Sequence, residues 1–453
     1  MVKTVKMLIA MGIDPDDVNI VNEEDDAISV GDITTAFLLA DEYGTDEVHR
    51  YVGYKSHKGA QLRIFQLLGP LYGQRDAGYR WWQTFTTWLK TQGFQQSEND
   101  LCLFSNPVTH MRIAVHVDDV IARGSKRQTK LFWDAVHSKY PLKAWKTVDY
   151  DNPVSYTGYT IGKEKRGAQT YYTMDMVSDI EAFVVDAQVD GSRATTAPMP
   201  YKEEILSDTT GVSDDEHKWF RSMVGSLSWF TNVRYDIAYE VNRIAQYTAK
   251  PTKGAMKALR RVLAYVSTTR DEKLAVPRVK GNTWHIYSDS EHAGETAMGN
   301  TRSHTGVIML LNGMPVHWRS NKQPKTSLSS VAAEIYAMSE AVKDASLRYW
   351  IAEDMHIATD WPMMLHVDNA AGESFQKSTC GQTKLKGIFN LRLEWVKELK
   401  NEGVVKAVHV ATDRNLADML TKRLTAEVRS KLEKCLETIA NKTATGLCFL
   451  GVT

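Results

Sequence analysis

An apolar run interrupted by two acids spans residues 111–121: Met111-Arg112-Ile113-Ala114-Val115-His116-Val117-Asp118-Asp119-Val120-Ile121. Apolar residues on both sides of an Asp pair predict a strand, a turn that carries the charges, and a second strand. Two carboxylates held side by side repel each other, and a divalent cation relieves that repulsion. Asp is also a favoured turn residue, so an ordinary β-turn is the better interpretation of the pair taken alone.

Composition sets wide bounds on the class of protein. The 453 residues suffice for two to four domains, and the formal net charge is zero, so bulk charge does not announce a nucleic-acid partner. The four cysteines lack metal-ligand spacing, which predicts reduced thiols in an intracellular protein. No apolar stretch reaches the roughly 18 residues that a membrane span needs, and we expect no membrane partner.

A third carboxylate precedes the Asp pair. The predicted strand Ile28 to Asp32 ends in an acid and leads into a turn with Phe37. Asp32, Asp118 and Asp119 brought together at strand ends are what two-metal phosphoryl transfer requires, with two Mg²⁺ roughly 3.5–4 Å apart. Phe37 fits a position near the sugar of a bound nucleotide, although a core aromatic is the simpler interpretation.

An independent acidic set lies in the last third of the chain. Asp289 and Asp368 end predicted strands, Glu334 lies on a predicted helix from Ser329 or Ser330 to about Met355, and Asp418 opens another helix. Each acid alone fits a surface charge or a cap. Together, on four elements in this order, they predict an α/β domain with a second site for two Mg²⁺ that activates water for attack on a phosphodiester.

Apolar periodicity and turn residues predict further elements. Helices are predicted over Ala77–Gln92, which Gly93 ends, over Thr129–Tyr140, and over Leu391–Asn401. Asn312-Gly313 predicts a hairpin, and residues 214–269 are predicted to be mostly helical. Residues 13–29 are acidic and predicted to be loop-like.

These motifs resemble the reverse transcriptase and ribonuclease H region of copia-type long-terminal-repeat retrotransposons. The polymerase matches are Gly31-Asp32 to Leu38, Leu71-Tyr72-Gly73 to Ala77 with Trp81-Trp82, Gly93 to Leu103, and Val117-Asp118-Asp119. Later matches are Trp219 to Leu227, Arg234 to Tyr239, Tyr287-Ser288-Asp289, Ala293-Gly294, Arg302 to Gly306, Trp318 with Ser320, Ser329 to Glu334, His366 to Asn369, and Asn415 to Asp418. They follow the family's order over roughly residues 28–425.

The resemblance implies roles for the candidate residues. Asp32, Asp118 and Asp119 are expected to bind two Mg²⁺ in the polymerase site, while Phe37 excludes a ribose 2′-hydroxyl and Tyr72 and Gly73 line the nucleotide pocket. The second metal site is expected to comprise Asp289, Glu334, Asp368 and Asp418. Expected partners are deoxynucleoside triphosphates, primer-template, RNA/DNA hybrid and other parts of a retrotransposon polyprotein. The expected location is intracellular: cytoplasmic, within virus-like particles, or nuclear.

The chain departs from the family pattern at several places. His116 replaces the Tyr before the Asp pair, Gly78 a Pro, Gly254 a His, and Ala332 the first of two glutamates. Only 31 residues precede Asp32, which predicts truncated fingers, and their acidic surface would repel phosphate. The alternative function is therefore an inactive retroelement remnant that binds nucleic acid at most, or one that keeps ribonuclease H activity alone.

The predicted fold class is a multidomain chain that combines α+β and α/β parts. A right-hand polymerase palm with partial fingers is expected over residues 28–150, after an acidic segment over 1–27. A mostly helical thumb and connection is expected over 151–280, a ribonuclease H-like domain over 281–430, and a tail over 431–453.

Overall fold

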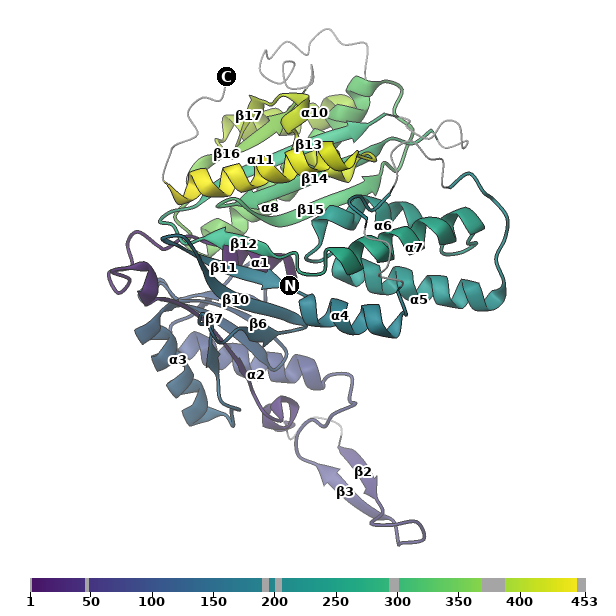
Figure 1. Ribbon diagram of the computed structural model, residues 1–453. Helices are drawn as coiled ribbons and strands as arrows, with labels where there is room; N and C mark the ends of the chain where they lie inside the picture. Colours follow the sequence, from purple (N-terminus) through teal and green to yellow (C-terminus); the bar gives the residue numbers. More distant parts are fainter. Residues whose placement is uncertain are drawn as a thin grey trace. The chain divides into compact units, whose positions relative to one another are not determined.

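The computed structural model describes residues 2–44, 49–189, 195–199, 206–292, 301–368 and 388–445. The chain is mixed α/β and divides into two compact units (Figure 1). Unit 1 comprises Asp17–Val148 with Asp354–His356, and unit 2 comprises Val2–Asp16, Asp149–Glu353 and the residues from Ile357 onward. None of the described helices is both long enough and apolar enough to cross a membrane.

Unit 1 is built on a six-stranded antiparallel sheet of strand order β4-β5-β6-β7-β1-β8. The strands are β1 (Asp26–Asp32), β4 (Gln95–Gln96), β5 (Leu103–Ser105), β6 (Arg112–His116), β7 (Asp119–Ser125) and β8 (Lys146–Thr147). Strands β6 and β7 confirm the predicted strand–turn–strand around the Asp pair. Because β7 lies in the middle of the sheet and pairs with β1, the Asp pair lies beside Asp32 at the end of β1.

One aromatic core joins the two long helices of unit 1 to this sheet. Helices α2 (Ala77–Thr91) and α3 (Lys126–Lys139) contribute Trp81, Phe85 and Trp133, all fully buried against strand residues such as Ile113. Gly93 has a φ of +84°, a left-handed conformation that glycine adopts without strain, and it ends α2 as predicted. This core holds in place the ends of β1 and β7, where the three acids lie.

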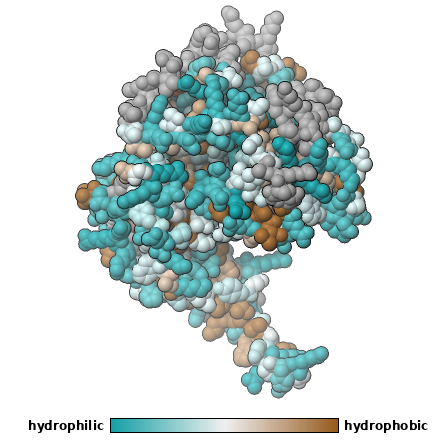
Figure 2. All heavy atoms as spheres, viewed as in Figure 1, coloured by the Kyte–Doolittle hydropathy of each residue, from teal (hydrophilic) through white to brown (hydrophobic). Residues whose placement is uncertain are grey.

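A two-stranded hairpin of unit 1 exposes apolar side chains. Strands β2 (Arg50–Tyr54) and β3 (Arg63–Leu67) pair only with each other, and Ile64 and Phe65 are exposed. Figure 2 shows hydrophobic surface toward the base of this hairpin and a hydrophilic tip. Two 3₁₀ turns complete the unit, η1 (Glu23–Asp25) and η2 (Ala36–Leu39).

The first part of unit 2 combines a sheet with helices. Its antiparallel strands are β9 (Val154–Tyr156), β10 (Tyr159–Arg166), β11 (Gln169–Asp175) and β12 (Leu274–Pro277), in the order β12-β11-β10-β9. The helices are α4 (Val177–Asp186), α5 (Asp214–Phe230), η3 (Tyr235–Ile237), α6 (Ala238–Ala245) and α7 (Lys253–Thr268). The helical prediction for residues 214–269 is confirmed, whereas the wider region expected to be mostly helical, residues 151–280, also contains these four strands.

The second part of unit 2 is a five-stranded mixed sheet of order β15-β14-β13-β16-β17. Its strands are β13 (Thr283–Glu291), β14 (His304–Leu311), β15 (Met314–Lys322), β16 (Asp360–Val367) and β17 (Val405–His409). Strands β13 to β15 are antiparallel, whereas β16 pairs in parallel with both β13 and β17. Asn312 and Gly313 both have positive φ values, which confirms the predicted hairpin turn.

Helices cover this sheet. They are α8 (Ser330–Asp354), α10 (Ile388–Asn401), η6 (Thr412–Arg414), η7 (Leu416–Leu420) and α11 (Ala426–Ala444). Residues of η7 and α11 form one core cluster with Tyr287 and Ile308 of the sheet, and Figure 1 shows α11 lying across β13 and β14. The sheet face that carries Tyr287 therefore also receives the segment that carries Asp418.

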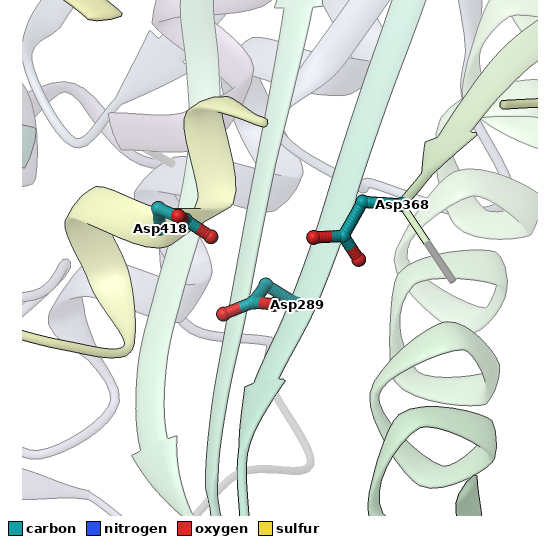
Figure 3. Close-up of side chains that lie close together, drawn as sticks. All are labelled: Asp289, Asp368 and Asp418. Atoms are coloured by element: carbon teal, nitrogen blue, oxygen red, sulfur yellow. The ribbon is translucent and has the colours of Figure 1, made fainter. Parts of the chain in front are cut away.

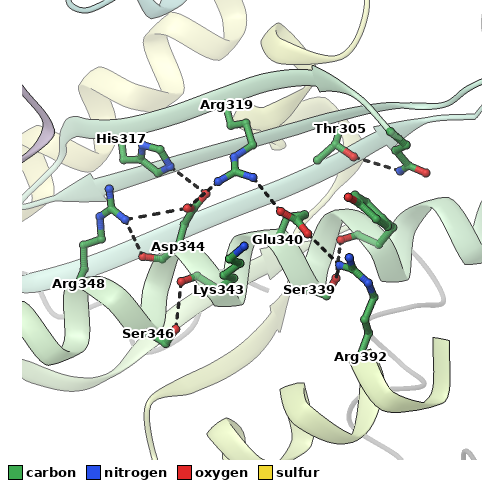
Figure 4. A network of polar contacts seen from close by, with 12 residues as sticks. Thr305, His317, Arg319, Ser339, Glu340, Lys343, Asp344, Ser346, Arg348 and Arg392 are labelled. Carbon is green, nitrogen blue, oxygen red and sulfur yellow. Dashed lines mark hydrogen bonds and ion pairs between the residues drawn. The ribbon is translucent and has the colours of Figure 1, made fainter. Parts of the chain in front are cut away.

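A buried polar network ties α8 to its neighbours (Figure 4). The Arg319 guanidinium of β15 donates to Glu340 and Asp344 of α8, each at 2.8 Å. Arg392 of α10 donates to the other oxygen of Glu340, also at 2.8 Å. Because breaking one partner of such a network leaves a buried charge uncompensated, α8 is held in one position against β15 and α10.

Both ends of the chain differ from the expectation. Helix α1 (Val2–Ala10) belongs to unit 2, where the Lys6 ammonium donates to the Asn232 carbonyl at 2.9 Å. After it, a Cβ on Gly12 would lie 1.8 Å from the Gly281 carbonyl oxygen, so only glycine fits. Residues 426–444 form the single helix α11, so the boundary expected at 430 falls inside a helix and residues 431–444 are not a tail.

Candidate active sites

The β6–β7 turn brings the three acids of unit 1 together at one sheet edge. Val117 and Asp118 form a two-residue turn, and Asp119 begins β7 opposite Asp32, the last residue of β1. The Ile33 amide donates to the Asp118 carbonyl at 3.0 Å. Pairing between β1 and β7 therefore brings Asp32 next to Asp118 and Asp119, as predicted.

The turn itself holds a strained residue. Val117 has a φ of +58°, an unusual value for a β-branched residue. The indole N–H of the fully buried Trp81 donates to the Val117 carbonyl at 2.7 Å. Strained residues persist where neighbours over-determine them, and this bond from α2 fixes the turn from the core side.

The charged side chains of this first site lie partly exposed to water. Burial raises the pKa of the Asp119 carboxyl, and the charges of Asp118 and Asp32 raise it further. The Lys143 ammonium lies 2.8 Å from the Asp32 carboxylate, and this hydrogen bond raises the pKa of Lys143. Within the part of the chain that the structure describes, these three acids do not form a group whose ligand oxygens all lie within 4.8 Å.

The predicted nucleotide-pocket residues also lie near one another. The rings of Phe37 and Tyr72 are 4.8 Å apart between centroids, and Tyr72 is exposed. Gly73 has a φ of +92°, a conformation that favours glycine, and a Cβ there would meet nothing within 4 Å. The structure therefore joins Phe37 and Tyr72 in one aromatic contact beside a glycine turn.

The second site gathers acids from three elements of unit 2 (Figure 3). Asp289 lies near the end of β13, Asp368 directly follows the parallel neighbour β16, and Asp418 lies on η7. One carboxylate oxygen from each lies within 4.8 Å of the other two. Asp289 and Asp418 are buried, and Asp368 is half-buried.

Local contacts place η7 beside the strands. The Asn415 side chain donates to the Ser288 carbonyl at 3.1 Å and accepts from the Ala417 amide at 3.2 Å, so it caps η7 and anchors it next to Asp289. Gly306, the β14 partner of Asp289, lies directly beneath η7. A Cβ on Gly306 would lie 2.8 Å from the Ala417 carbonyl oxygen, so glycine permits this close approach.

Charge is concentrated at the second site. Burial raises the pKa of Asp418 to about 7, and the neighbouring Asp289 carboxylate contributes to the shift. Burial and Asp289 also raise the pKa of Asp368. The Lys422 ammonium lies 3.0 Å from Asp418 and 3.5 Å from Asp289, and these acids raise its pKa. An all-oxygen set of mutually repelling carboxylates suits a hard divalent cation such as Mg²⁺.

One sequence-predicted candidate lies apart from this group. Glu334, in the first turns of α8, is half-buried and does not belong to the three-carboxylate group found among the described residues. Ala293-Gly294 and Asn369, which carried part of the family resemblance, lie outside the described residues.

Sequence reasoning missed two residues that contact the acids. The Thr421 hydroxyl donates to Asp289, and Lys422 pairs with both Asp289 and Asp418. The available signal was spacing, since Lys422 follows Asp418 by four residues, the separation that faces side chains together on a helical turn.

A pair of imidazoles lies on the same two strands, with His366 two residues before Asp368 and His285 four residues before Asp289. His285 and His366 share a hydrogen bond of 3.0 Å, and the His366 ring stacks on Tyr287 at 4.3 Å between centroids. Burial lowers the pKa of His285 to about 4 and that of His366 to about 3. Both rings are therefore neutral at pH 7, and they add no positive charge next to the carboxylates.

Comparison with known proteins shows that the chain is similar to proteins of mobile elements. Residues 3–199 match the family described as reverse transcriptase (RNA-dependent DNA polymerase). Over 407 residues, 87% of this chain, it is 27% identical to the retrovirus-related Pol polyprotein from transposon RE2 of Arabidopsis thaliana and covers 26% of that protein. This chain is a relative of copia-type retrotransposon Pol polyproteins.

Other Pol polyproteins give the same picture. The chain is 23% identical over 421 residues to that of transposon TNT 1-94 from Nicotiana tabacum, covering 90% of this chain and 30% of that protein. It is 24% identical over 408 residues to the Ty1-LR2 Gag-Pol polyprotein of Saccharomyces cerevisiae, covering 87% of this chain and 23% of that protein. The chain thus spans about a quarter of the length of these Pol relatives.

Solved structures resemble parts of this Pol relative. LC11-RNase H1, isolated from compost, is 20% identical, with a TM-score of 0.24 over 34% of this chain and 98% of that one. A foamy viral protease-reverse transcriptase in complex with dsDNA is 10% identical, with a TM-score of 0.21 over 85% of this chain and 68% of that one.

Proposed function

We propose that the chain is an RNA-directed DNA polymerase with ribonuclease H activity, and that each activity uses its own pair of Mg²⁺ ions. The observation that carries this proposal is the gathering of Asp289, Asp368 and Asp418, whose ligand oxygens lie within 4.8 Å of one another. The reverse transcriptase family match over residues 3–199 supports the polymerase part.

In the ribonuclease H step, the three aspartates of unit 2 would hold the cations and orient an attacking water. Bound Mg²⁺ would supply a lowered water pKa and charge stabilisation at the phosphate. Burial of Asp289 and Asp418 strengthens their interaction with a cation, because the local dielectric is low. We include Glu334 as a fourth ligand in this proposal on the strength of the family resemblance alone.

In the polymerase step, Asp32, Asp118 and Asp119 would hold Mg²⁺ between the primer 3′-hydroxyl and a deoxynucleoside triphosphate. Phe37 would exclude a ribose 2′-hydroxyl, and Tyr72 with Gly73 would line the nucleotide pocket. The fixed turn at Val117 supports this assignment, since the Trp81 hydrogen bond holds the Asp pair against β1.

The proposed nucleic-acid partners are primer-template and RNA/DNA hybrid, contacted mainly through their backbones. The helices over residues 214–269 carry several basic residues, and not all of them are available for such contacts. Arg234 is buried in an ion pair of 2.8 Å with Asp236, and Arg243 is also buried. Arg221 and Arg260 are exposed and remain candidates for phosphate contacts.

Two assays on the purified chain test the proposal, with Mg²⁺ present throughout. Primer extension should be lost in Asp118→Asn, and cleavage of the RNA strand of a hybrid should be lost in Asp289→Asn. Each variant should keep the activity of the other site. Equal primer extension by wild type and Asp118→Asn, including absence in both, refutes the polymerase part. Hybrid cleavage that survives Asp289→Asn refutes the ribonuclease H part.

One observation favours a second candidate, a chain with ribonuclease H activity alone. The three-carboxylate group in unit 2 is compact, whereas the acids of unit 1 do not meet the same 4.8 Å limit among the described residues. This candidate predicts hybrid cleavage that depends on Asp289, with no primer extension by any variant. An inert remnant predicts neither activity.

A further inference from the structure

Lys422 lies against two of the three aspartates in unit 2. Its ammonium is 3.0 Å from an Asp418 oxygen and 3.5 Å from an Asp289 oxygen. The side chain is 33% exposed, so it reaches the acids from the solvent side of the group. Among the described residues, both ion pairs recorded for these two aspartates go to Lys422.

The backbone directs the side chain to this position. The Lys422 amide donates to the Asp418 carbonyl at 3.2 Å, so one helix-like turn separates the two residues and faces them to the same side. Thr421, the preceding residue, donates its hydroxyl to Asp289. The segment after η7 therefore brings two consecutive side chains to the acids.

The Lys422 ammonium offsets the mutual repulsion of the aspartate carboxylates. Three carboxylates within 4.8 Å repel one another, and Asp289 and Asp418 are withdrawn from water. A lysine ammonium is a compact point charge on a flexible stem, so it can approach the acids and also leave them. A divalent cation held by Asp289 and Asp418 would bind the same two carboxylates that Lys422 contacts, so the two positive charges would repel each other.

We propose that Lys422 is a tethered counter-ion that competes with the divalent cation for Asp289 and Asp418. The ammonium holds the aspartates together when no metal is bound, and metal binding displaces it. Lys422 thereby weakens metal affinity and sets the cation concentration at which the site fills. This inference rests on the proposed metal site of unit 2.

Mn²⁺ titration of the full chain by calorimetry tests the proposal. The binding step that is absent in Asp289→Asn is assigned to this site. In Lys422→Met that step should tighten about tenfold, because the competing charge is gone, while Lys422→Arg, which keeps the charge, should titrate like wild type. Lys406→Met removes an exposed lysine of β17 and is the matched control, with no expected change.

Thermal unfolding gives a readout that is independent of calorimetry. Without metal, Lys422→Met should unfold at a lower temperature than wild type, and saturating Mn²⁺ should remove the difference. Lys422→Gln serves in the same tests if the Met variant does not fold.

Equal or weaker Mn²⁺ binding in the charge-removing variant overturns the role of Lys422, while leaving the metal site intact. If Asp289→Asn titrates like wild type, the metal site itself falls, and the role of Lys422 falls with it.

Discussion

The two carboxylate sites of this chain use the same ingredients in different surroundings. Each contains three aspartates and one lysine. In unit 1 the Lys143 side chain is 70% exposed and Asp32 is 37% exposed. In unit 2 Lys422 is 33% exposed, and Asp289 and Asp418 are 4% and 9% exposed. Water screens the first pair strongly, whereas the buried charges interact strongly with one another.

The difference also lies in how the backbone supplies the acids. One hairpin turn and its neighbouring strand provide Asp118, Asp119 and Asp32, so local β-pairing alone sets their spacing. Asp289, Asp368 and Asp418 come from two parallel strands and a 3₁₀ helix far along the chain. The second site therefore depends on tertiary packing, and packing changes should damage it more than the first.

The largest effect is expected from Gly306→Ala. The new Cβ would lie 2.7–3.0 Å from Thr421, Ala417 and Leu420, so η7 must move and carry Asp418 with it. We expect hybrid cleavage to fall about a hundredfold and unit 2 to lose about 1–3 kcal/mol of stability. Rates of cleavage and urea unfolding measure the two effects.

Gly225→Ala is the control for that change. A Cβ at Gly225 of α5 meets nothing within 4 Å, so this variant should be as stable as wild type or slightly more stable. Primer extension should be unchanged in both variants. Full hybrid cleavage by Gly306→Ala would show that the position of η7 is not critical.

A second effect concerns the pH dependence of stability without metal. The pKa of Asp418 in the fold is raised to about 7, so the folded state binds this proton more tightly than the unfolded chain does. Its stabilising contribution is present below the unfolded pKa of roughly 4 and is lost as pH rises toward 7. The loss should be on the order of 1–3 kcal/mol.

Urea unfolding between pH 4 and 8 in a chelator measures this dependence. Asp418→Asn should flatten the decline, because the amide does not titrate. Asp32→Asn should leave the decline in place, since Asp32 lies in the more exposed site. If stability declined equally with pH in wild type and Asp418→Asn, other titratable groups would cause the decline.

The smallest effect is expected from Trp81→Phe in unit 1. The change removes the 2.7 Å hydrogen bond to the Val117 carbonyl while keeping an aromatic ring in the core. We expect a loss of about 1 kcal/mol in stability, and primer extension reduced about tenfold, because the turn is held less firmly. Trp88→Phe on the same helix is the matched control, and hybrid cleavage should not change in either variant.

The sequence was most informative where local chemistry fixes local structure. The Asp pair between apolar runs, Gly93 after a periodic helix, and Asn312-Gly313 between strands each predicted the element that the structure contains. Turn and cap preferences act over a few residues and need no tertiary context.

Tertiary contacts explain what the sequence did not show. Strand β10 carries charged residues such as Lys163, which obscure its alternation, and its neighbour β11 also pairs with the distant β12. Helix α1 is held by Asn232, and Ile13 just after it by Gly281, each more than 200 residues away. Likewise, no sequence pattern announced Lys422 as a partner of Asp289, because their contact depends on where η7 packs.

The claim that Asp289, Asp368 and Asp418 together hold a divalent cation is tested most directly by anomalous diffraction from crystals grown with Mn²⁺. We predict an anomalous peak bounded by these three carboxylates, with the Lys422 ammonium no longer in contact with Asp289 and Asp418. The same crystals of Asp289→Asn should lack that peak. The account would be contradicted if crystals grown at saturating Mn²⁺ showed the three carboxylates well ordered but no Mn²⁺ between them, with Lys422 still paired to Asp289 and Asp418.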